Sequence, residues 1–228
     1  MSIYTFWEGP MFPYIDLCLK TWRFPFTILT YDNVNQYTDL PVDDNLKRFS
    51  LSHVADAVRA HVLRDSGGYW LDADTIMVTD QLPTAQMIGY PERREHTAGY
   101  LYADKPGIQL YKDWSEYQDK VIRDPNASHH WSIMANAFTD VYIKDHPEVT
   151  ICPVRNCWPE TYMVPGSGNR YGKYLRLYFE CSCHLKDIDP TDMLMLHNSW
   201  TPQWYKELSE EEVLAHDCTL SNILKELL

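Results

Sequence analysis

One segment of the chain spaces its hydrophobic residues as a helix does and then stops at two glycines. Valines recur every fourth residue, at Val54, Val58 and Val62. At about 100° per residue they form one apolar stripe, which predicts a helix over His53–Arg64. Gly67 and Gly68 supply the backbone freedom with which a helix ends and the chain turns. Tyr69, Trp70 and Leu71 then predict a short aromatic-rich strand.

Strand and helix patterns alternate along the rest of the chain. We expect strands over Ile3–Trp7 and Phe26–Tyr31 and on both sides of Asp72, and helices over Tyr14–Trp22, Lys112–Val121, Trp131–Phe138, Glu207–His216 and Leu220–Leu228, with Ser209 as a cap candidate. This alternation predicts a layered α/β fold, a mixed central β-sheet flanked by helices. A length of 228 residues with 45% hydrophobic residues suits one domain, 1–228.

The predicted strand at Tyr69–Leu71 ends in a D-x-D tripeptide formed by Asp72, Ala73 and Asp74. Ligands bind open α/β sheets at the carboxyl ends of the strands. Two carboxylates at positions i and i+2 can share one hard cation, and magnesium or manganese held by few carboxylates completes its shell with phosphate oxygens and water. The tripeptide therefore indicates a site for a metal and a diphosphate, although a solvated acidic turn gives the same letters.

Charge and composition narrow the partners. The formal net charge is −12, which argues against nucleic acid and anionic membrane surfaces, because phosphate backbones are bound by surplus Lys and Arg. No apolar stretch approaches the roughly 20 residues that span a bilayer, and Glu8 and Asp16 interrupt the N-terminal segment. We therefore expect no transmembrane segment and a cytoplasmic protein.

Six cysteines are most simply thiols in a reducing compartment. Four of them lie in two short clusters, Cys152 with Cys157 and Cys181 with Cys183. Their C-x4-C and C-x-C-H spacings do not match common structural zinc sites. Whether this group binds metal stays open at the level of sequence.

Three motifs together resemble the D-x-D sugar transferases of glycosyltransferase family 32. They are D-x-x-R at Asp56 and Arg59, G-G-aromatic-aromatic-L-D-x-D from Gly67 to Asp74, and the C-terminal His197-Asn198-Ser199-Trp200. That group includes capsular polysaccharide synthesis proteins and yeast Golgi mannosyltransferases, and the glucosylating toxins are more distant relatives. Residues 3–10 and 151–162 also resemble its first strand and a late strand.

The resemblance implies a GT-A type nucleotide-sugar-binding fold and a metal-dependent glycosyltransferase. Such an enzyme moves a sugar from a nucleotide diphosphate sugar, here UDP-hexose, to a hydroxyl of a glycan or oligosaccharide acceptor. The resemblance further implies a retaining reaction in polysaccharide or surface-glycan synthesis, with Mn²⁺ or Mg²⁺ as cofactor. Golgi members of the family usually carry a membrane anchor, so the expected lack of a transmembrane segment fits a bacterial protein, a viral one in the host cytoplasm or a truncated form better than a Golgi enzyme.

Site residues follow from the same resemblance. The expected catalytic residues are Asp56, Arg59, Asp72 and Asp74, and the expected metal ligands are Asp72, Asp74 and His197. The nucleotide-sugar side adds Phe6, Trp7, Trp70, Ala73, Ser199 and Trp200. Candidates on the acceptor side are His130, Trp131, Glu160 and Tyr162, because aromatic faces and carboxylates suit sugars.

Each of these assignments has a structural alternative. Asp56 and Arg59 could form only a helix ion pair at i and i+3, worth a few tenths of a kcal/mol, and Phe6, Trp7 and the two tryptophans could be core residues. An inverting enzyme would need a carboxylate base, for which Glu160 is the candidate. Phosphatase and nucleotidyltransferase D-x-D sites differ in register or spacing. A non-catalytic nucleotide- or carbohydrate-binding protein on the same fold is the remaining alternative.

Overall fold

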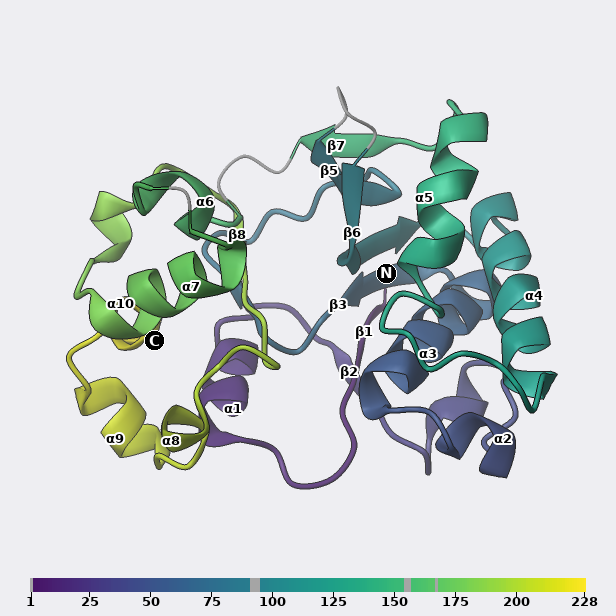
Figure 1. Ribbon diagram of the computed structural model, residues 1–228, viewed down its shortest axis with the longest axis horizontal. Coiled ribbons are helices and arrows are strands. Elements are labelled where there is room, and N and C mark those ends of the chain that lie inside the picture. The colour runs from purple at the N-terminus through teal and green to yellow at the C-terminus, as the bar shows by residue number, and fades with distance from the viewer. Residues whose placement is uncertain (1, 91–94, 154–156, 167) are drawn as a thin grey trace. The chain divides into compact units, whose positions relative to one another are not determined.

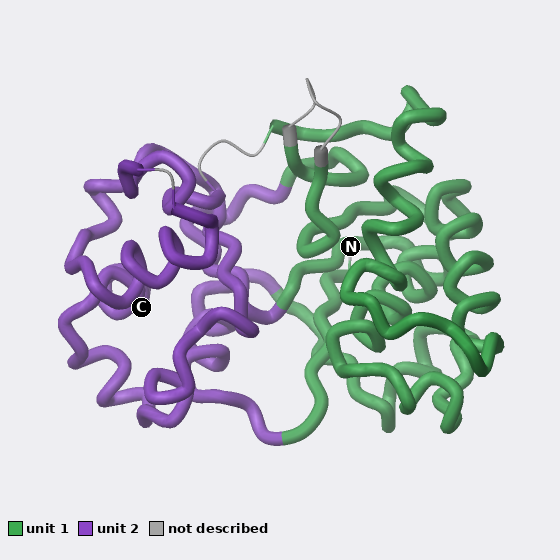
Figure 2. The backbone as a smooth tube through the Cα atoms, viewed as in Figure 1, with its two compact units in different colours: residues 1–9, 25–72, 83–153 green, residues 10–24, 73–82, 154–228 purple. Residues whose placement is uncertain are grey.

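A computed structural model describes residues 2–90, 95–153, 157–166 and 168–228. The chain folds into two compact units (Figure 2). Unit 1 comprises residues 1–9, 25–72 and 83–153, and unit 2 comprises residues 10–24, 73–82 and 154–228. The chain passes from unit 1 to unit 2 between Asp72 and Ala73, inside the D-x-D tripeptide. That the whole chain behaves as a single domain stays a prediction.

Unit 1 contains a mixed β-sheet. Within the described residues its strand order is β2-β1-β3-β6-β5-β7. The strands are β1 (Ile3–Phe6), β2 (Thr27–Leu29), β3 (Gly68–Leu71), β5 (Met87–Tyr90), β6 (Glu95–Ala103) and β7 (Ile151–Pro153). β1 runs parallel to β2 and β3, β6 runs antiparallel to β3 and β5, and β7 runs parallel to β5.

Helices cover this sheet, which confirms the predicted α/β class (Figure 1). They are α2 (Asp44–Lys47), α3 (Leu51–Ser66), α4 (Gln109–Arg123) and α5 (Asn136–Asp145), with a 3₁₀ turn at Val34–Gln36. α3 packs on β1, β3 and β6, and α4 packs on α3. The predicted helices over His53–Arg64 and Lys112–Val121 lie inside α3 and α4.

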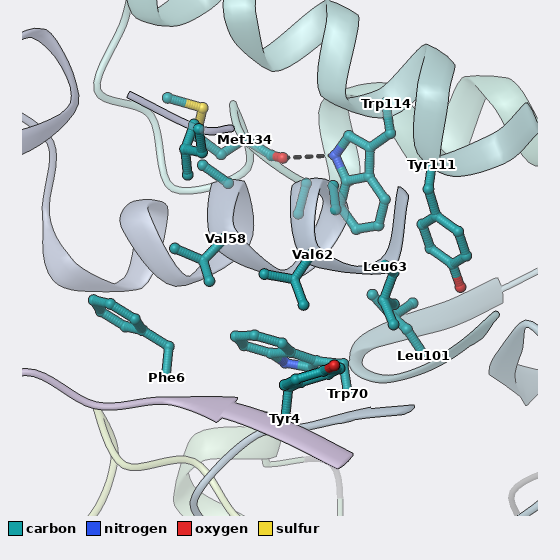
Figure 3. Close-up of a cluster of buried hydrophobic side chains, with 14 of the residues drawn as sticks. Tyr4, Phe6, Val58, Val62, Leu63, Trp70, Leu101, Tyr111, Trp114 and Met134 are labelled. Atoms are coloured by element: carbon teal, nitrogen blue, oxygen red, sulfur yellow. Dashed lines mark hydrogen bonds between the residues drawn. The ribbon is translucent and has the colours of Figure 1, made fainter. Parts of the chain in front are cut away.

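The valine stripe of α3 faces the sheet, as the spacing predicted. Val58 and Val62 point from α3 toward Trp70, Tyr4 and Phe6 on the strands (Figure 3). All five side chains are buried. Burying a side chain of the size of Val or Phe contributes about 1.5–3 kcal/mol, so this interface fixes α3 and the strand that leads to Asp72.

The two glycines at the end of α3 are required by the backbone. Gly67 has φ +63° and Gly68 has φ +100°, a region that other residues rarely adopt. A Cβ at Gly68 would lie 2.5 Å from the main-chain oxygen of Ser2, and one at Gly67 would lie 2.9 Å from the carbonyl carbon of Lys105. The predicted helix stop is therefore confirmed, with the close approach of Ser2 as an additional reason.

Unit 2 is mainly helical around a short antiparallel ladder. β4 (Thr75–Met77) pairs with β8 (Met193–Met195), with Thr75 opposite Met195. Its helices are α1 (Pro13–Lys20), α6 (Glu160–Met163), α7 (Arg170–Leu175), α8 (Gln203–Lys206), α9 (Glu210–Ala215) and α10 (Thr219–Leu227), with a π-helical turn at Arg176–Glu180 and a 3₁₀ turn at Leu185–Asp187. α1 packs on β4, α8 and α9.

Two helix predictions were wrong in position. Residues 131–135 form turns, and α5 begins only at Asn136, because the carbonyl of Met134 accepts hydrogen bonds from the Trp114 indole at 2.8 Å and from Gln118 at 2.6 Å instead of from a helical N–H. Of the expected helix over Glu207–His216, only Glu210–Ala215 is helical, as α9, and Ser209 caps it with a capping box, as its side chain predicted. Among the described residues, no helix has the length and apolar character needed to cross a membrane.

Candidate functional site

Unit 1 holds a charge cluster around the buried Arg59 at the end of β3. Nη2 of Arg59 lies 3.2 Å from Oδ1 of Asp56 and 3.0 Å from Oδ1 of Asp72. Nη1 donates to the carbonyl of Ala98, and Nε donates to the carbonyl of Ala55 at 3.3 Å. The Arg59 side chain is only 7% exposed. The predicted D-x-x-R pair is thus an i, i+3 ion pair, but a buried one that extends to the first aspartate of the D-x-D.

Trp70 completes this cluster from the strand. Its indole N–H donates to Oδ1 of Asp72 at 2.9 Å, and its ring lies 5.2 Å below the guanidinium of Arg59. Trp70 is 1% exposed and belongs to the core. Trp70 therefore acts on the site through the orientation of Asp72 and not as an exposed stacking surface.

Burial changes the protonation of Asp56. Desolvation raises the pKa of Asp56 to about 7, the Arg59 cation opposes the shift, and the Asp72 carboxylate adds to it. Burial disfavours the charged carboxylate, so Asp56 titrates near neutrality.

Unit 2 brings the second aspartate beside the C-terminal motif. The main-chain oxygen of Asp74 accepts a hydrogen bond from Leu196 N–H at 3.2 Å, which extends the β4–β8 ladder by one step. Beyond it, the N–H of Asn198 donates to Oδ2 of Asp74 at 2.7 Å. The side-chain oxygen of Asn198 accepts a hydrogen bond from the Tyr14 hydroxyl at 2.5 Å. Two sequence motifs more than a hundred residues apart therefore meet within this unit.

His197 sits in an aromatic setting that keeps its imidazole neutral. Its ring centroid lies 4.0 Å from that of Trp200 and 5.7 Å from that of Tyr174. Burial, assisted by the nearby Arg170 cation, lowers the pKa of His197 to about 3. Nε2 is buried and has no hydrogen-bond partner within the described part of the chain. A neutral imidazole with an unsatisfied nitrogen has the chemistry of a metal ligand or a hydrogen-bond partner.

Glu160 is a buried carboxylate of unit 2 that lies near His197. Oε1 of Glu160 accepts a hydrogen bond from Nε of Arg170 at 2.9 Å, and the guanidinium stacks on Trp158 at 4.3 Å and faces Trp200 at 5.7 Å. Glu160 is fully buried, and this burial raises its pKa. Oε2 of Glu160 and Nη2 of Arg170 are buried without a hydrogen-bond partner among the described residues. Glu160 belongs to unit 2, and its predicted place on the acceptor side stays a prediction.

The remaining predicted residues vary in exposure. Phe6 and Ala73 are buried, and Phe6 belongs to the core of unit 1. Ser199 is exposed, while Trp7 and Trp200 are half-buried. On the predicted acceptor side, Trp131 is 69% exposed, Tyr162 is 43% exposed, and His130 is exposed and bonds Ser132 through Nδ1 at 2.9 Å.

The predicted metal ligands belong to different units. Asp72 lies in unit 1, whereas Asp74 and His197 lie in unit 2. The covalent chain alone keeps the α-carbons of Asp72 and Asp74 within about 7 Å of each other, because one residue separates them. Over the described ranges, no group of three or more His, Cys, Asp and Glu residues forms a metal-binding set, and this covers the cysteine clusters as well.

Three residues of unit 2 were missed by the sequence reading. Tyr14 holds Asn198, Arg170 pairs with Glu160, and Lys206 lies near enough to Asp74 for the carboxylate to oppose the lowering of its pKa by burial. Each is distant in sequence from the motif it serves, and none stands at a motif spacing. Only the fold reveals them.

A family model for the capsular polysaccharide synthesis protein matches residues 18–149, which is more than half of the chain. The chain belongs to this family. The matched residues include Asp56, Arg59, Asp72 and Asp74. The match confirms the part of the resemblance that named capsular polysaccharide synthesis proteins. The narrower assignment to glycosyltransferase family 32 stays a prediction. No curated protein matches the chain.

Three solved structures resemble this chain distantly. One is an active-site mutant of LgtC, with 11% identity, coverage of 89% of this chain and 92% of that chain, and a TM-score of 0.39. Two others are the glycosyltransferase GlyE of Streptococcus pneumoniae TIGR4 and its apo form, each with 13% identity and coverage of 99% of this chain, with TM-scores of 0.45 and 0.43. The match spans 62% of each GlyE chain, less than two thirds. At these TM-scores the likeness carries no functional argument.

Proposed function

We propose that this protein is a metal-dependent glycosyltransferase of GT-A type that transfers a hexose from a UDP-sugar to a hydroxyl of a glycan, with retention, in capsular or other surface polysaccharide synthesis. The observation that carries the proposal is the buried Arg59 bridge between Asp56 and Asp72 at the end of β3, in a chain of the capsular polysaccharide synthesis family. A surface ion pair would be worth little. A buried bridge that orients the first aspartate of a D-x-D suits the hydroxyls of a sugar or ribose.

The donor atoms fit a divalent cation in kind. Asp74 offers a carboxylate and His197 a neutral imidazole whose Nε2 lacks a partner among the described residues. Carboxylate and imidazole suit manganese, and carboxylate suits magnesium. In this proposal Asp74 and His197 hold the metal and Asp72 contacts sugar, ribose or a metal-bound water. When bound, the metal neutralises the negative charge that develops on the departing diphosphate.

This chain's own residues then position the donor. Arg59 directs its donors at Ala55, Ala98, Asp56 and Asp72. Its role in the proposal is therefore to orient the two carboxylates and not to bind the phosphates of the donor. Asp56, with a pKa of about 7, can donate or accept a hydrogen bond toward a sugar hydroxyl. Both residues lie on α3, whose packing on the sheet holds them still.

The retaining outcome is supported by the state of Glu160. An inverting enzyme needs a carboxylate base at the acceptor hydroxyl. Glu160, the candidate from sequence, is fully buried and tied to Arg170. A retaining reaction needs no such base if the leaving phosphate accepts the proton of the acceptor hydroxyl. A cytoplasmic location of the protein also stays a prediction.

The test is UDP release from a panel of UDP-sugars with manganese. We expect release from one donor, lost with a chelator and reduced at least about a hundredfold in Asp74→Ala. Asp80→Ala is the matched control, because Asp80 is an exposed aspartate of the same unit. Anomeric analysis of the product by NMR checks retention. Metal-dependent UDP binding without sugar release would favour a non-catalytic binding protein, and no UDP binding would overturn the proposal.

A further inference from the structure

Unit 1 contains a pocket that does not include Asp56, Arg59 or Asp72. It is formed by the C-terminal half of α4 and the segment 124–133, and its volume is about 340 Å³. Ligand pockets range from about 300 to 1,000 Å³, so this one suits a single monosaccharide. The family match includes the whole pocket.

The lining of the pocket combines apolar surface with hydrogen-bonding groups. Tyr117 and Ile133 supply the apolar part, and Lys120, Asn126 and Ser128 supply donors and acceptors. A sugar ring presents the same combination, with C–H faces and hydroxyl edges. Asp124 also lines the pocket and balances the charge of Lys120, whereas a phosphate site would need surplus positive charge. The chemistry therefore favours a neutral sugar over a nucleotide.

The segment that bears the pocket is held in place by α2 and by the residues that follow it. Arg48 donates to the carbonyls of Asp124 at 2.5 Å, Pro125 at 3.1 Å and Ile122 at 3.2 Å. Its neighbour Phe49 packs against His129 with ring centroids 4.9 Å apart. A binding surface ordered in advance loses less entropy when its ligand arrives. These contacts give segment 124–133 that order.

Trp131 extends this surface into solvent. It is 69% exposed, more than any other large hydrophobic side chain in the described residues. The backbone beside it is fixed, because Nε2 of His53 donates to the carbonyl of His130 at 3.1 Å. An exposed indole on a fixed backbone offers a flat apolar face at little cost in conformational entropy, as sugar stacking requires.

The pocket is also connected to the helix of the D-x-x-R motif. Gln118, next to Tyr117 on α4, donates through Nε2 to the carbonyl of Asp56 at 2.8 Å and to that of Met134 at 2.6 Å. Trp114 donates to the same Met134 carbonyl (Figure 3). The buried side-chain amide of Gln118 thus links α3, which carries Asp56 and Arg59, to Met134, which follows the segment that carries Trp131.

We propose that this pocket and Trp131 form the acceptor-binding site, in which the pocket takes one neutral sugar residue of the glycan and the indole stacks on the residue beside it. The inference rests on the proposed glycosyltransferase function and names the acceptor part of it. It assigns Lys120, Asn126 and Ser128 to the recognition of hydroxyls and gives Trp131 the role of a platform.

The test uses the full chain and methyl glycosides of glucose, galactose, mannose and N-acetylglucosamine as probes. Binding is followed by saturation-transfer NMR and by the indole N–H signal of Trp131. We expect at least one glycoside to bind and to shift that signal. Trp131→Ala and Lys120→Ala should each weaken binding about tenfold, which corresponds to about 1.4 kcal/mol, while manganese-dependent UDP binding stays unchanged.

Matched controls are available on the same scaffold. Trp204→Ala removes a half-exposed tryptophan of unit 2, and Lys112→Ala removes an exposed lysine of α4 outside the pocket; neither should alter glycoside binding. Absence of glycoside binding, or binding that ignores Trp131 and Lys120, overturns the acceptor site even if UDP binds. Glycoside binding at Trp131 in a protein that never binds UDP keeps the sugar site but contradicts the proposed transferase.

Discussion

Each unit contains an arginine that stacks on a tryptophan and pairs with a buried carboxylate. In unit 1 Arg59 lies over Trp70 and meets Asp56 and Asp72. In unit 2 Arg170 lies over Trp158 and meets Glu160. Both clusters are thus built from an arginine, a tryptophan and acidic side chains, aspartates in unit 1 and a glutamate in unit 2.

The two clusters differ in how completely their polar atoms are satisfied. Among the described residues, no side-chain atom of Asp56, Arg59 or Asp72 is buried without a partner, whereas the cluster of unit 2 leaves Oε2 of Glu160, Nη2 of Arg170 and the nearby Nε2 of His197 unsatisfied. Each such atom costs about 1–3 kcal/mol. The cluster of unit 1 is therefore complete, whereas the cluster of unit 2 holds polar atoms that a ligand or water could stabilise.

The largest test of this comparison removes each arginine. Arg59→Met removes the buried cation that pairs with Asp56 and with the partly exposed Asp72, and breaking a buried ion pair costs about 3–5 kcal/mol. Arg170→Met should cost less, about 1–2 kcal/mol, because the Arg170 side chain is about a third exposed and pairs with one carboxylate, whereas Arg59 is 7% exposed and pairs with two. The free energy of unfolding in urea at one pH measures both.

Equal losses for the two variants would show that the unit 2 cluster is as complete as the unit 1 cluster. Lys47→Met, an exposed cation on α2, is the control for a general effect of charge removal and should change stability by less than about 0.5 kcal/mol.

The next test compares two glycines with similar backbone. Gly68 in unit 1 has φ +100° and Gly166 in unit 2 has φ +105°, so alanine is strained by about 1–2 kcal/mol at either position. A Cβ at Gly68 also meets the Ser2 oxygen at 2.5 Å, while one at Gly166 meets nothing within 4 Å. Gly68→Ala should therefore cost about 3 kcal/mol in total, against about 1 kcal/mol for Gly166→Ala, in thermal and urea unfolding. Similar losses of stability in the two variants would mean that a Cβ fits at Gly68 as easily as at Gly166.

The same contrast explains what the sequence could predict. In unit 1 the helix, its glycine stop, the strand and Asp72 follow one another along the chain, so spacing and turn chemistry were enough to predict them. The buried bridge from Arg59 to Asp72 needed the fold, because sequence spacing shows the i, i+3 pair but not its burial. β5 and β6 were missed, since their residues carry no clear alternation.

Unit 2 was predictable only in pieces. The C-terminal His197-Asn198 motif could be recognised, but its contact with Asp74 depends on the β4–β8 ladder, which pairs segments more than a hundred residues apart. Arg170 follows a turn, and Tyr14 lies near the N-terminus; neither carries a local signal. Tertiary hydrogen bonds to Met134 likewise displaced the helix expected over Trp131–Phe138.

The smallest and most specific test is the pH dependence of the two clusters. Burial raises the pKa of Asp56 from 3.8 to about 7, so between these values the folded chain keeps a proton that the unfolded chain has released, and the free energy of unfolding falls as pH rises. Burial lowers the pKa of His197 from 6.5 to about 3. Between these two values His197 is protonated in the unfolded chain and neutral in the folded chain, so the free energy of unfolding rises with pH.

The two contributions should cancel between about pH 4 and pH 6.5, each with a slope of up to about 1.4 kcal/mol per pH unit. Asp56→Asn removes the falling contribution, so its stability relative to the wild type should increase with pH across that window. His197→Asn should show the opposite trend, and the double variant should again run parallel to the wild type. Urea unfolding of the metal-free protein at a series of pH values measures these differences. Two single variants with trends of the same sign would contradict the conclusion that burial favours the neutral form of both Asp56 and His197.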